Sequence, residues 1–152
     1  MKLGAGLSKL KSDKSQLARL IKLRKDSMYV KEGKTPSFDA AELTDSINSK
    51  IDEIRELKVR IMKTNLGTEI EDLALAEAII KVGDLRSKIA NLTELIEFDR
   101  RYSWLDRDDK EVDYTPQINE SLIEEEARKL EQEKVKLDNE IQKMNWTVEL
   151  VE

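Results

Sequence analysis

The sequence contains neither cysteine nor histidine. Without cysteine the chain has no disulfide, no thiolate nucleophile and no cysteine-ligated metal. Without histidine it also lacks the commonest general base and the commonest metal ligand, so catalysis would depend on carboxylates, lysines or tyrosines. We therefore expect a protein that is not an enzyme and that carries no metal and no cofactor.

Proline, glycine and aromatic residues are also scarce. The 152 residues include two prolines, five glycines and 5% aromatics, whereas hydrophobic and charged residues make up 39% each. This composition is typical of long amphipathic helices, and the length suits a single domain spanning residues 1–152. No apolar run approaches the roughly 18 residues of a membrane span, and the first ten residues lack the apolar core of a signal peptide. We expect a cytoplasmic protein with no membrane partner.

Apolar residues recur with helical spacing in four segments. The first and last segments follow a heptad pattern, which in the last runs from Ile123 to Met144. Asp39 with Glu42, and Thr68 with Glu71, have the spacing of capping boxes at the starts of the second and third segments. The sequence thus predicts an all-α fold, an elongated antiparallel bundle or coiled coil of about four helices, at residues 3–31, 39–65, 69–99 and 119–144. A long loop at 100–118 and a short extended tail at 145–152 complete the prediction.

Charge is unevenly distributed along the chain. Residues 1–36 hold ten lysines or arginines against three acidic residues, whereas the remainder holds 17 against 29. The simplest interpretation is that the basic first helix packs along acidic helices of its own bundle or of a neighbouring subunit. The net charge of −5 disfavours nucleic acid as a partner. Because four long helices make a thin core, we expect a homo-oligomer.

Two clusters of polar and aromatic residues are predicted at opposite ends of the bundle. One cluster holds Arg100, Arg101, Tyr102 and Trp104, whose guanidinium groups and rings suit a phosphate joined to a planar group. The other holds Asn65, Thr68, Asn145, Trp146 and Thr147. Antiparallel packing of two subunits would bring the clusters together as a ligand site.

Simpler interpretations of both clusters remain open. Tyr102 and Trp104 would cover the bundle end while the arginines cap helix carbonyls, and the tail would be a hook that docks on a neighbouring chain. The acidic residues between Asp106 and Asp113 lack the glycine and the bidentate glutamate of an EF-hand, so they predict a solvated loop rather than a metal site.

Several short segments resemble one protein family across nearly the whole chain. The most specific is the ending Asn145-Trp146-Thr147, supported by Thr64-Asn65 and by Arg101-Tyr102-Ser103. These motifs resemble a family of small uncharacterised helical proteins of bacteria and phages, sometimes labelled septicolysin. The resemblance implies a helical, oligomeric protein and no established activity.

Taken together, these features predict a non-enzymatic homo-oligomer that binds or sequesters a small anionic ligand at its subunit interfaces. A concrete case is a phage anti-defence sponge for a nucleotide-type signalling molecule. The alternative is a structural or adaptor coiled coil with no small ligand. An enzyme using paired carboxylates, or Tyr102 with Arg101, is the third and weakest hypothesis.

Overall fold

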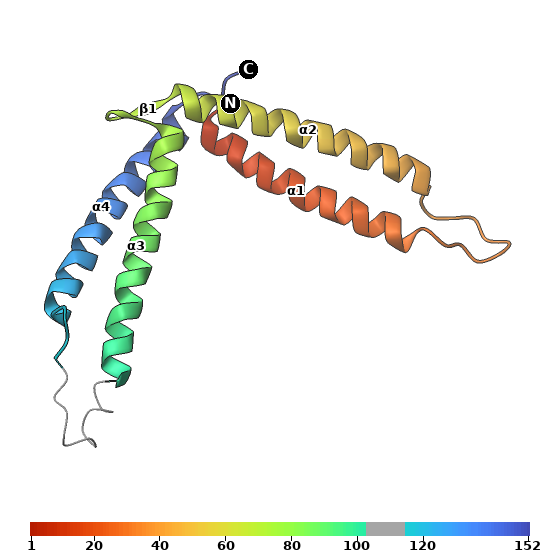
Figure 1. The fold of residues 1–152 in the computed structure, drawn as a ribbon. Coiled ribbons are helices and arrows are strands. Elements are labelled where there is room, and N and C mark those ends of the chain that lie inside the picture. The colour runs from red at the N-terminus through yellow and green to blue at the C-terminus, as the bar shows by residue number, and fades with distance from the viewer. Residues whose placement is uncertain (103–114) are drawn as a thin grey trace. The chain divides into compact units, whose positions relative to one another are not determined.

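The computed structural model describes residues 1–102 and 115–152, and it has the predicted all-α fold (Figure 1). Its helices are α1 (Leu3–Asp26), α2 (Ala40–Gly67), α3 (Leu75–Tyr102) and α4 (Glu120–Thr147), with a two-stranded sheet of β1 (Glu69–Ile70) and β2 (Leu73–Ala74). The chain divides into two compact units. Unit 1 comprises Met1–Glu69 and Lys143–Glu152, and unit 2 comprises Ile70–Gln142.

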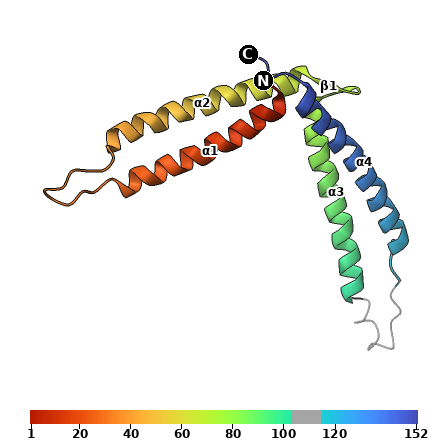
Figure 2. The same cartoon turned by 180° about the vertical axis from the view of Figure 1, so that it is seen from behind.

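Unit 1 is built on the helical hairpin of α1 and α2, which lie side by side in both views of the ribbon (Figures 1 and 2). The apolar stripe of α2 supplies most of the core, with Leu43, Ile47, Ile54, Leu57 and Ile61 buried. Asp13 of α1 is buried as well, and its carboxylate pairs with Lys9 at 2.6 Å and with Lys50 of α2 at 3.7 Å. A buried carboxylate needs such partners, so these ion pairs help to fix how α1 lies on α2.

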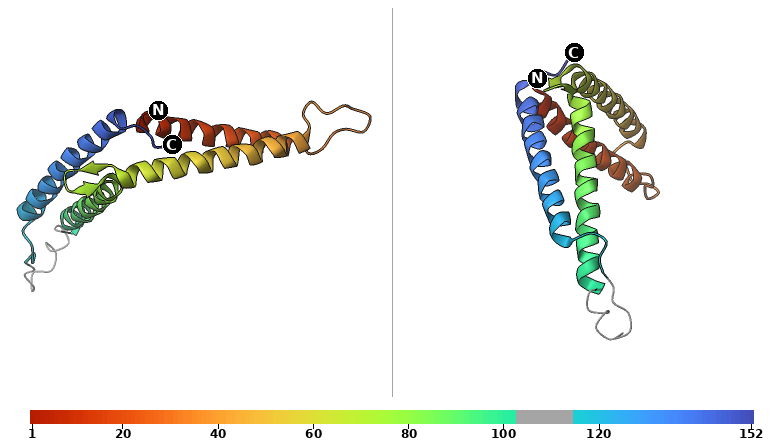
Figure 3. Two further views of the ribbon diagram at one scale, coloured as in Figure 1. Left: turned by 90° about the horizontal axis from the view of Figure 1, so that it is seen from above. Right: turned by 60° about the vertical axis from the view of Figure 1, so that its left-hand side comes forward.

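The C-terminal tail completes unit 1 by pairing with the start of α1, and the two termini lie next to each other (Figure 3). The N–H of Leu3 donates to the carbonyl oxygen of Val148 at 3.0 Å, and the N–H of Leu150 donates to that of Met1 at 2.7 Å. Glu149 pairs with Lys2 at 2.7 Å and with the terminal amine at 2.9 Å. The tail therefore docks on its own chain in this structure, whereas the hook interpretation placed it on a neighbouring chain.

The predicted capping box of α2 is confirmed at its first residue. The side chain of Asp39 accepts hydrogen bonds from the N–H groups of Ala41, at 2.7 Å, and of Glu42, at 3.4 Å. These bonds satisfy two N–H groups that have no partner inside the helix. The sequence thus located this helix start to within one residue.

The predicted start of the third helix at residue 69 is wrong. The chain forms the β1–β2 hairpin there, and its turn places Glu71 at a φ of 53°. The true cap lies further on, where the carboxylate of Glu77 accepts a hydrogen bond from the N–H of Ala74 at 3.0 Å. Glu77 is the third residue of α3, so this is the glutamate half of a capping box. Thr68 with Glu71 has similar spacing in the sequence but does not cap the helix.

The last residues of all four helices also differ from the predicted ones, and α2 ends at Gly67 instead of 65. Helix α1 ends at Asp26 instead of 31, and the N–H and the hydroxyl of Ser27 both donate to the carbonyl oxygen of Leu23, at 3.0 and 2.8 Å. Helix α4 continues to Thr147, whose hydroxyl donates to the carbonyl oxygen of Lys143 at 2.9 Å. Helix α3 continues to Tyr102. The predicted loop 100–118 therefore begins later, and its residues 103–114 lie outside the described part.

In unit 2, α3 and α4 run antiparallel, as their ion pairs show. Arg100, near the end of α3, bonds to the start of α4, whereas Arg86 pairs with Asp138 at 3.3 Å near the other end of the hairpin. The seam of α3 is buried at its beginning, where Leu75, Ala78, Val82 and Leu85 are nearly inaccessible. It is only half-buried further on, at Ile89, Leu92 and Ile96. The far half of the hairpin is thus incompletely covered within unit 2.

Candidate functional site

A mostly apolar cavity of about 340 Å³ lies in unit 2, where α3 ends and α4 begins. Its apolar lining comprises Leu95, Ile96, Phe98, Pro116, Ile118 and Ile123, and Gln117 and Glu120 supply the polar part. The cavity forms because the last turns of α3 and the residues preceding α4 carry large apolar side chains. The contact between α3 and α4 leaves these side chains about half exposed. Its volume falls at the lower end of the range of small-molecule pockets.

Arg100 stands beside this cavity and is bound to α4. Its guanidinium group donates to Glu120, which lines the cavity, at 2.9 Å and to Glu124 at 2.8 Å. The carboxylate of Glu120 raises the pKa of Arg100, with a smaller contribution from Glu124. These bonds tie the end of α3 to the start of α4, and an anion at Arg100 would compete with two carboxylates.

Arg101 is the more accessible of the two predicted arginines. Its side chain is 76% exposed, and its ion pair with Glu97 is long, at 3.8 Å. An exposed pair of this kind contributes little to stability, so the guanidinium group is available to an incoming anion at small cost. Tyr102 is the last residue of α3, and Trp104 lies outside the described residues.

The structure gathers the second predicted cluster at one end of unit 1. Asn65 and Thr68 lie where α2 ends, and the tail passes close to them, since the N–H of Val151 donates to the hydroxyl of Thr64 at 3.0 Å. Asn145 and Thr147 belong to the last turns of α4, and Trp146 between them is 67% exposed. The side-chain oxygen of Asn65 is buried and has no hydrogen-bond partner among the described residues.

The two clusters belong to different units. Arg100, Arg101 and Tyr102 are in unit 2, whereas Asn65, Thr68, Asn145, Trp146 and Thr147 are in unit 1. Their meeting across subunits therefore stays a prediction.

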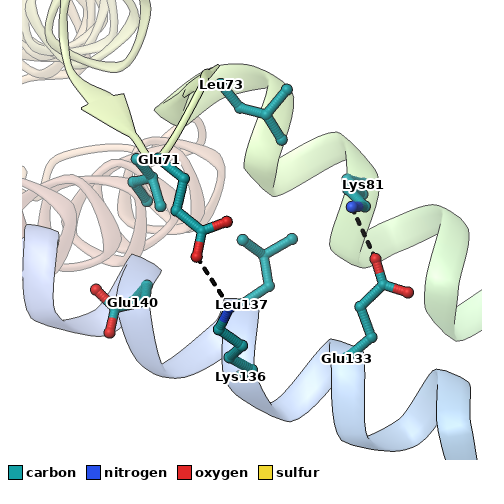
Figure 4. Close-up of a pocket in the computed structure, with 8 residues that line it drawn as sticks. Glu71, Leu73, Lys81, Glu133, Lys136, Leu137 and Glu140 are labelled. Atoms are coloured by element: carbon teal, nitrogen blue, oxygen red, sulfur yellow. Dashed lines mark hydrogen bonds and ion pairs between the residues drawn. The ribbon is translucent and has the colours of Figure 1, made fainter.

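The sequence interpretation missed a second cavity, of about 110 Å³, beside the β-hairpin of unit 2 (Figure 4). Two ion pairs stand at this cavity, between Lys81 and Glu133 at 2.7 Å and between Lys136 and Glu71 at 3.0 Å. Lys81 lowers the pKa of Glu133, and Glu71 raises the pKa of Lys136. Both lysines are already paired and the volume is small, so this cavity does not suit a nucleotide. Its residues come from the β-hairpin, α3 and α4, which are far apart in the sequence, so no local motif marks them.

No group of three or more acidic side chains within residues 1–102 and 115–152 is arranged to hold a metal ion. None of the helices described here is long and apolar enough to cross a membrane.

Comparison with known proteins places the chain among proteins of undetermined activity. The model of a family described as "Family of unknown function (DUF6847)" matches residues 10–150. The crystal structure of a functionally unknown conserved protein from Corynebacterium diphtheriae is similar over 99% of both chains, with a TM-score of 0.81 and 28% sequence identity. No curated protein matches the sequence.

Proposed function

The chain belongs to the family of unknown function DUF6847, and we propose that it is a non-enzymatic, homo-oligomeric protein that sequesters a small anionic ligand of nucleotide type. The observation that supports this proposal is the apolar cavity at the end of the α3–α4 hairpin, where Arg100 bonds to the lining residue Glu120 and the exposed Arg101 is the next residue of α3. A planar base fits an apolar cavity, and guanidinium groups bind phosphate through paired hydrogen bonds.

The apolar surface that each unit leaves uncovered supports the proposed self-association. Phe98, Ile118 and Leu122 of unit 2 and Trp146 of unit 1 are more than half exposed. A group of exposed large apolar residues is typical of protein interfaces, where aromatic side chains are enriched. In the proposed oligomer, the exposed Trp146 of one subunit faces the arginines of another. The oligomer would act in the cytoplasm, as a sponge for a nucleotide signal.

A structural or adaptor role without a ligand is the second candidate, and Arg100 favours it. Because this guanidinium group already bonds to Glu120 and Glu124, it has a role in holding α3 to α4 whether or not an anion binds. In that case subunit contacts would cover the exposed aromatic residues.

Nucleotide binding to matched arginine variants distinguishes the two candidates. We expect calorimetric titration of the wild-type protein with a panel of mono-, di- and cyclic nucleotides to give saturable binding. Arg101→Gln should weaken that binding at least tenfold, the effect of losing a charge-assisted hydrogen bond of roughly 1.5–3 kcal/mol. Arg128→Gln is the control, because Arg128 is exposed on α4 away from the cavity lining. Absence of binding by every nucleotide would favour the structural role.

A further inference from the structure

Helix α3 has a second face that nothing in unit 2 covers. Ile80, Gly83, Ser87 and Ala90 follow the three- and four-residue spacing of one helix face, and all four are exposed. Ile80 is 65% exposed, and a Cβ added at Gly83 would meet no atom within 4 Å. Small residues around one isoleucine let another helix approach closely.

Two carboxylates accompany this face of α3. Asp84 and Glu94 are exposed and form no ion pair within the described part of the chain. They are ten residues apart, which is about 15 Å along a helix. Unit 2 as a whole holds 11 basic and 20 acidic residues, so its net charge is negative.

Helix α1 has a face of opposite charge. Lys11, Lys14, Lys22 and Lys25 share it with the exposed Leu7 and Ala18, again at three- and four-residue spacing. Lys22 pairs with Asp26 at 3.0 Å, whereas Lys11, Lys14 and Lys25 have no acidic partner in the described ranges. Lys14 and Lys25 are 11 residues apart, about 16.5 Å along the helix. Unit 1 holds 16 basic and 12 acidic residues.

We infer that the basic face of α1 docks on the outer face of α3 of a second copy of this chain. The lysine spacing matches the carboxylate spacing to within about one residue, and each face also carries one larger exposed apolar side chain, Leu7 or Ile80, that contact would bury. In a two-fold dimer the contact would occur twice, since each copy offers both faces. This inference rests on the proposed homo-oligomer and identifies the surfaces that form it.

Charge reversal tests the pairing, because the altered side chains are all exposed and their substitution leaves the cores intact. Lys14→Glu with Lys25→Glu is one variant, and Asp84→Lys with Glu94→Lys is the other. We expect the dissociation constant for self-association, measured by sedimentation, to be at least tenfold higher for each variant alone than for the wild type. An equimolar mixture of the two should associate again, since opposite charges then meet across the two chains. Lys58→Glu with Lys63→Glu, which makes the same charge change on α2, should associate like the wild type.

Other outcomes overturn the inference in distinguishable ways. If the wild type associates and neither double variant weakens it, the docking surfaces are wrong while self-association stands. If both variants dissociate but their mixture does not recover, the two faces do not contact each other. A monomeric wild type at all concentrations and low salt would contradict both the surfaces and the proposed oligomer.

Discussion

The backbone N–H of Leu3 donates to the carbonyl oxygen of Val148, 145 positions later in the sequence, at 3.0 Å. This hydrogen bond, with the return bond from Leu150 to Met1, holds the tail against the first turn of α1. The contact is close, because a Cβ added at Gly4 would lie 2.9 Å from the carbonyl oxygen of Asn145. The integrity of unit 1 therefore depends on a few residues at its two chain ends.

Gly4→Ala should destabilise the protein, since a backbone carbonyl cannot move away cheaply from the added methyl group. We expect a loss of about 1–3 kcal/mol in the free energy of unfolding, measured by urea denaturation at fixed protein concentration. Gly67→Ala is the matched control, because nothing lies within 4 Å of a Cβ at that residue. Equal effects of the two substitutions would contradict the tight docking of the tail.

The α3–α4 hairpin should depend on its apolar seam more than on its ion pairs. Leu85 is 3% exposed, so Leu85→Ala should cost about 2–5 kcal/mol. Lys81→Met removes an exposed pair with Glu133 and should cost less than about 1 kcal/mol. Urea denaturation gives the loss in the free energy of unfolding for both variants. A larger loss for Lys81→Met than for Leu85→Ala would show that the ion pair stabilises the hairpin more than the apolar contact does.

Asp13 should make unit 1 sensitive to acid. Its pKa is lowered chiefly by the hydrogen bond from Lys9, and Lys50 contributes. A carboxylate with a lowered pKa stabilises the folded state above its ordinary value of 3.8, and this stabilisation is lost as the pH falls through the lowered value. Asp13→Asn should thus lower the melting temperature at pH 7, with a difference that shrinks below about pH 4. Asp45→Asn, at an exposed position of α2, is the control substitution. A difference in melting temperature for Asp13→Asn that stays constant as the pH falls would refute the assignment.

Glu71 occupies a backbone conformation that disfavours most side chains, with a φ of 53°. Asparagine tolerates this region better, so Glu71→Asn should stabilise the protein by up to about 1 kcal/mol. Glu71→Gln removes the charge facing Lys136 in the same way but keeps the unfavourable conformation. The melting temperature of Glu71→Asn should be higher than that of Glu71→Gln, and the reverse order would mean that the turn is not strained.

The sequence predicted the long elements because local chemistry defines them. Asp39 caps α2, and the heptads of α4 mark its seam, so these helices were located to within a few residues. The β-hairpin was not predicted, because strands of two residues are too short to show a periodic pattern. In addition, Thr68 and Glu71 have the spacing of a capping box, which wrongly indicated a helix start. The end of α1 was placed too far along, since Met28 continues the heptad although it is more than half exposed.

The candidate site was only partly predictable for a related reason. The sequence singled out Arg100 and Arg101 by residue type, and the cluster around Asn65 and Trp146 by its position near helix ends. It could not show that Glu120 and Glu124 would bind Arg100, because that contact depends on the register of α3 against α4. Nor could it show the apolar cavity beside them, which depends on how incompletely the two helices cover their seam.

Native mass spectrometry of the freshly purified protein tests the central claim most directly, because it reports subunit number and any bound small molecule together. The account predicts a defined oligomer that carries, or takes up from a nucleotide mixture, an added mass equal to a nucleotide in whole-number ratio to the subunits. A monomer, or an oligomer that stays bare after incubation with every nucleotide in the mixture, would contradict it.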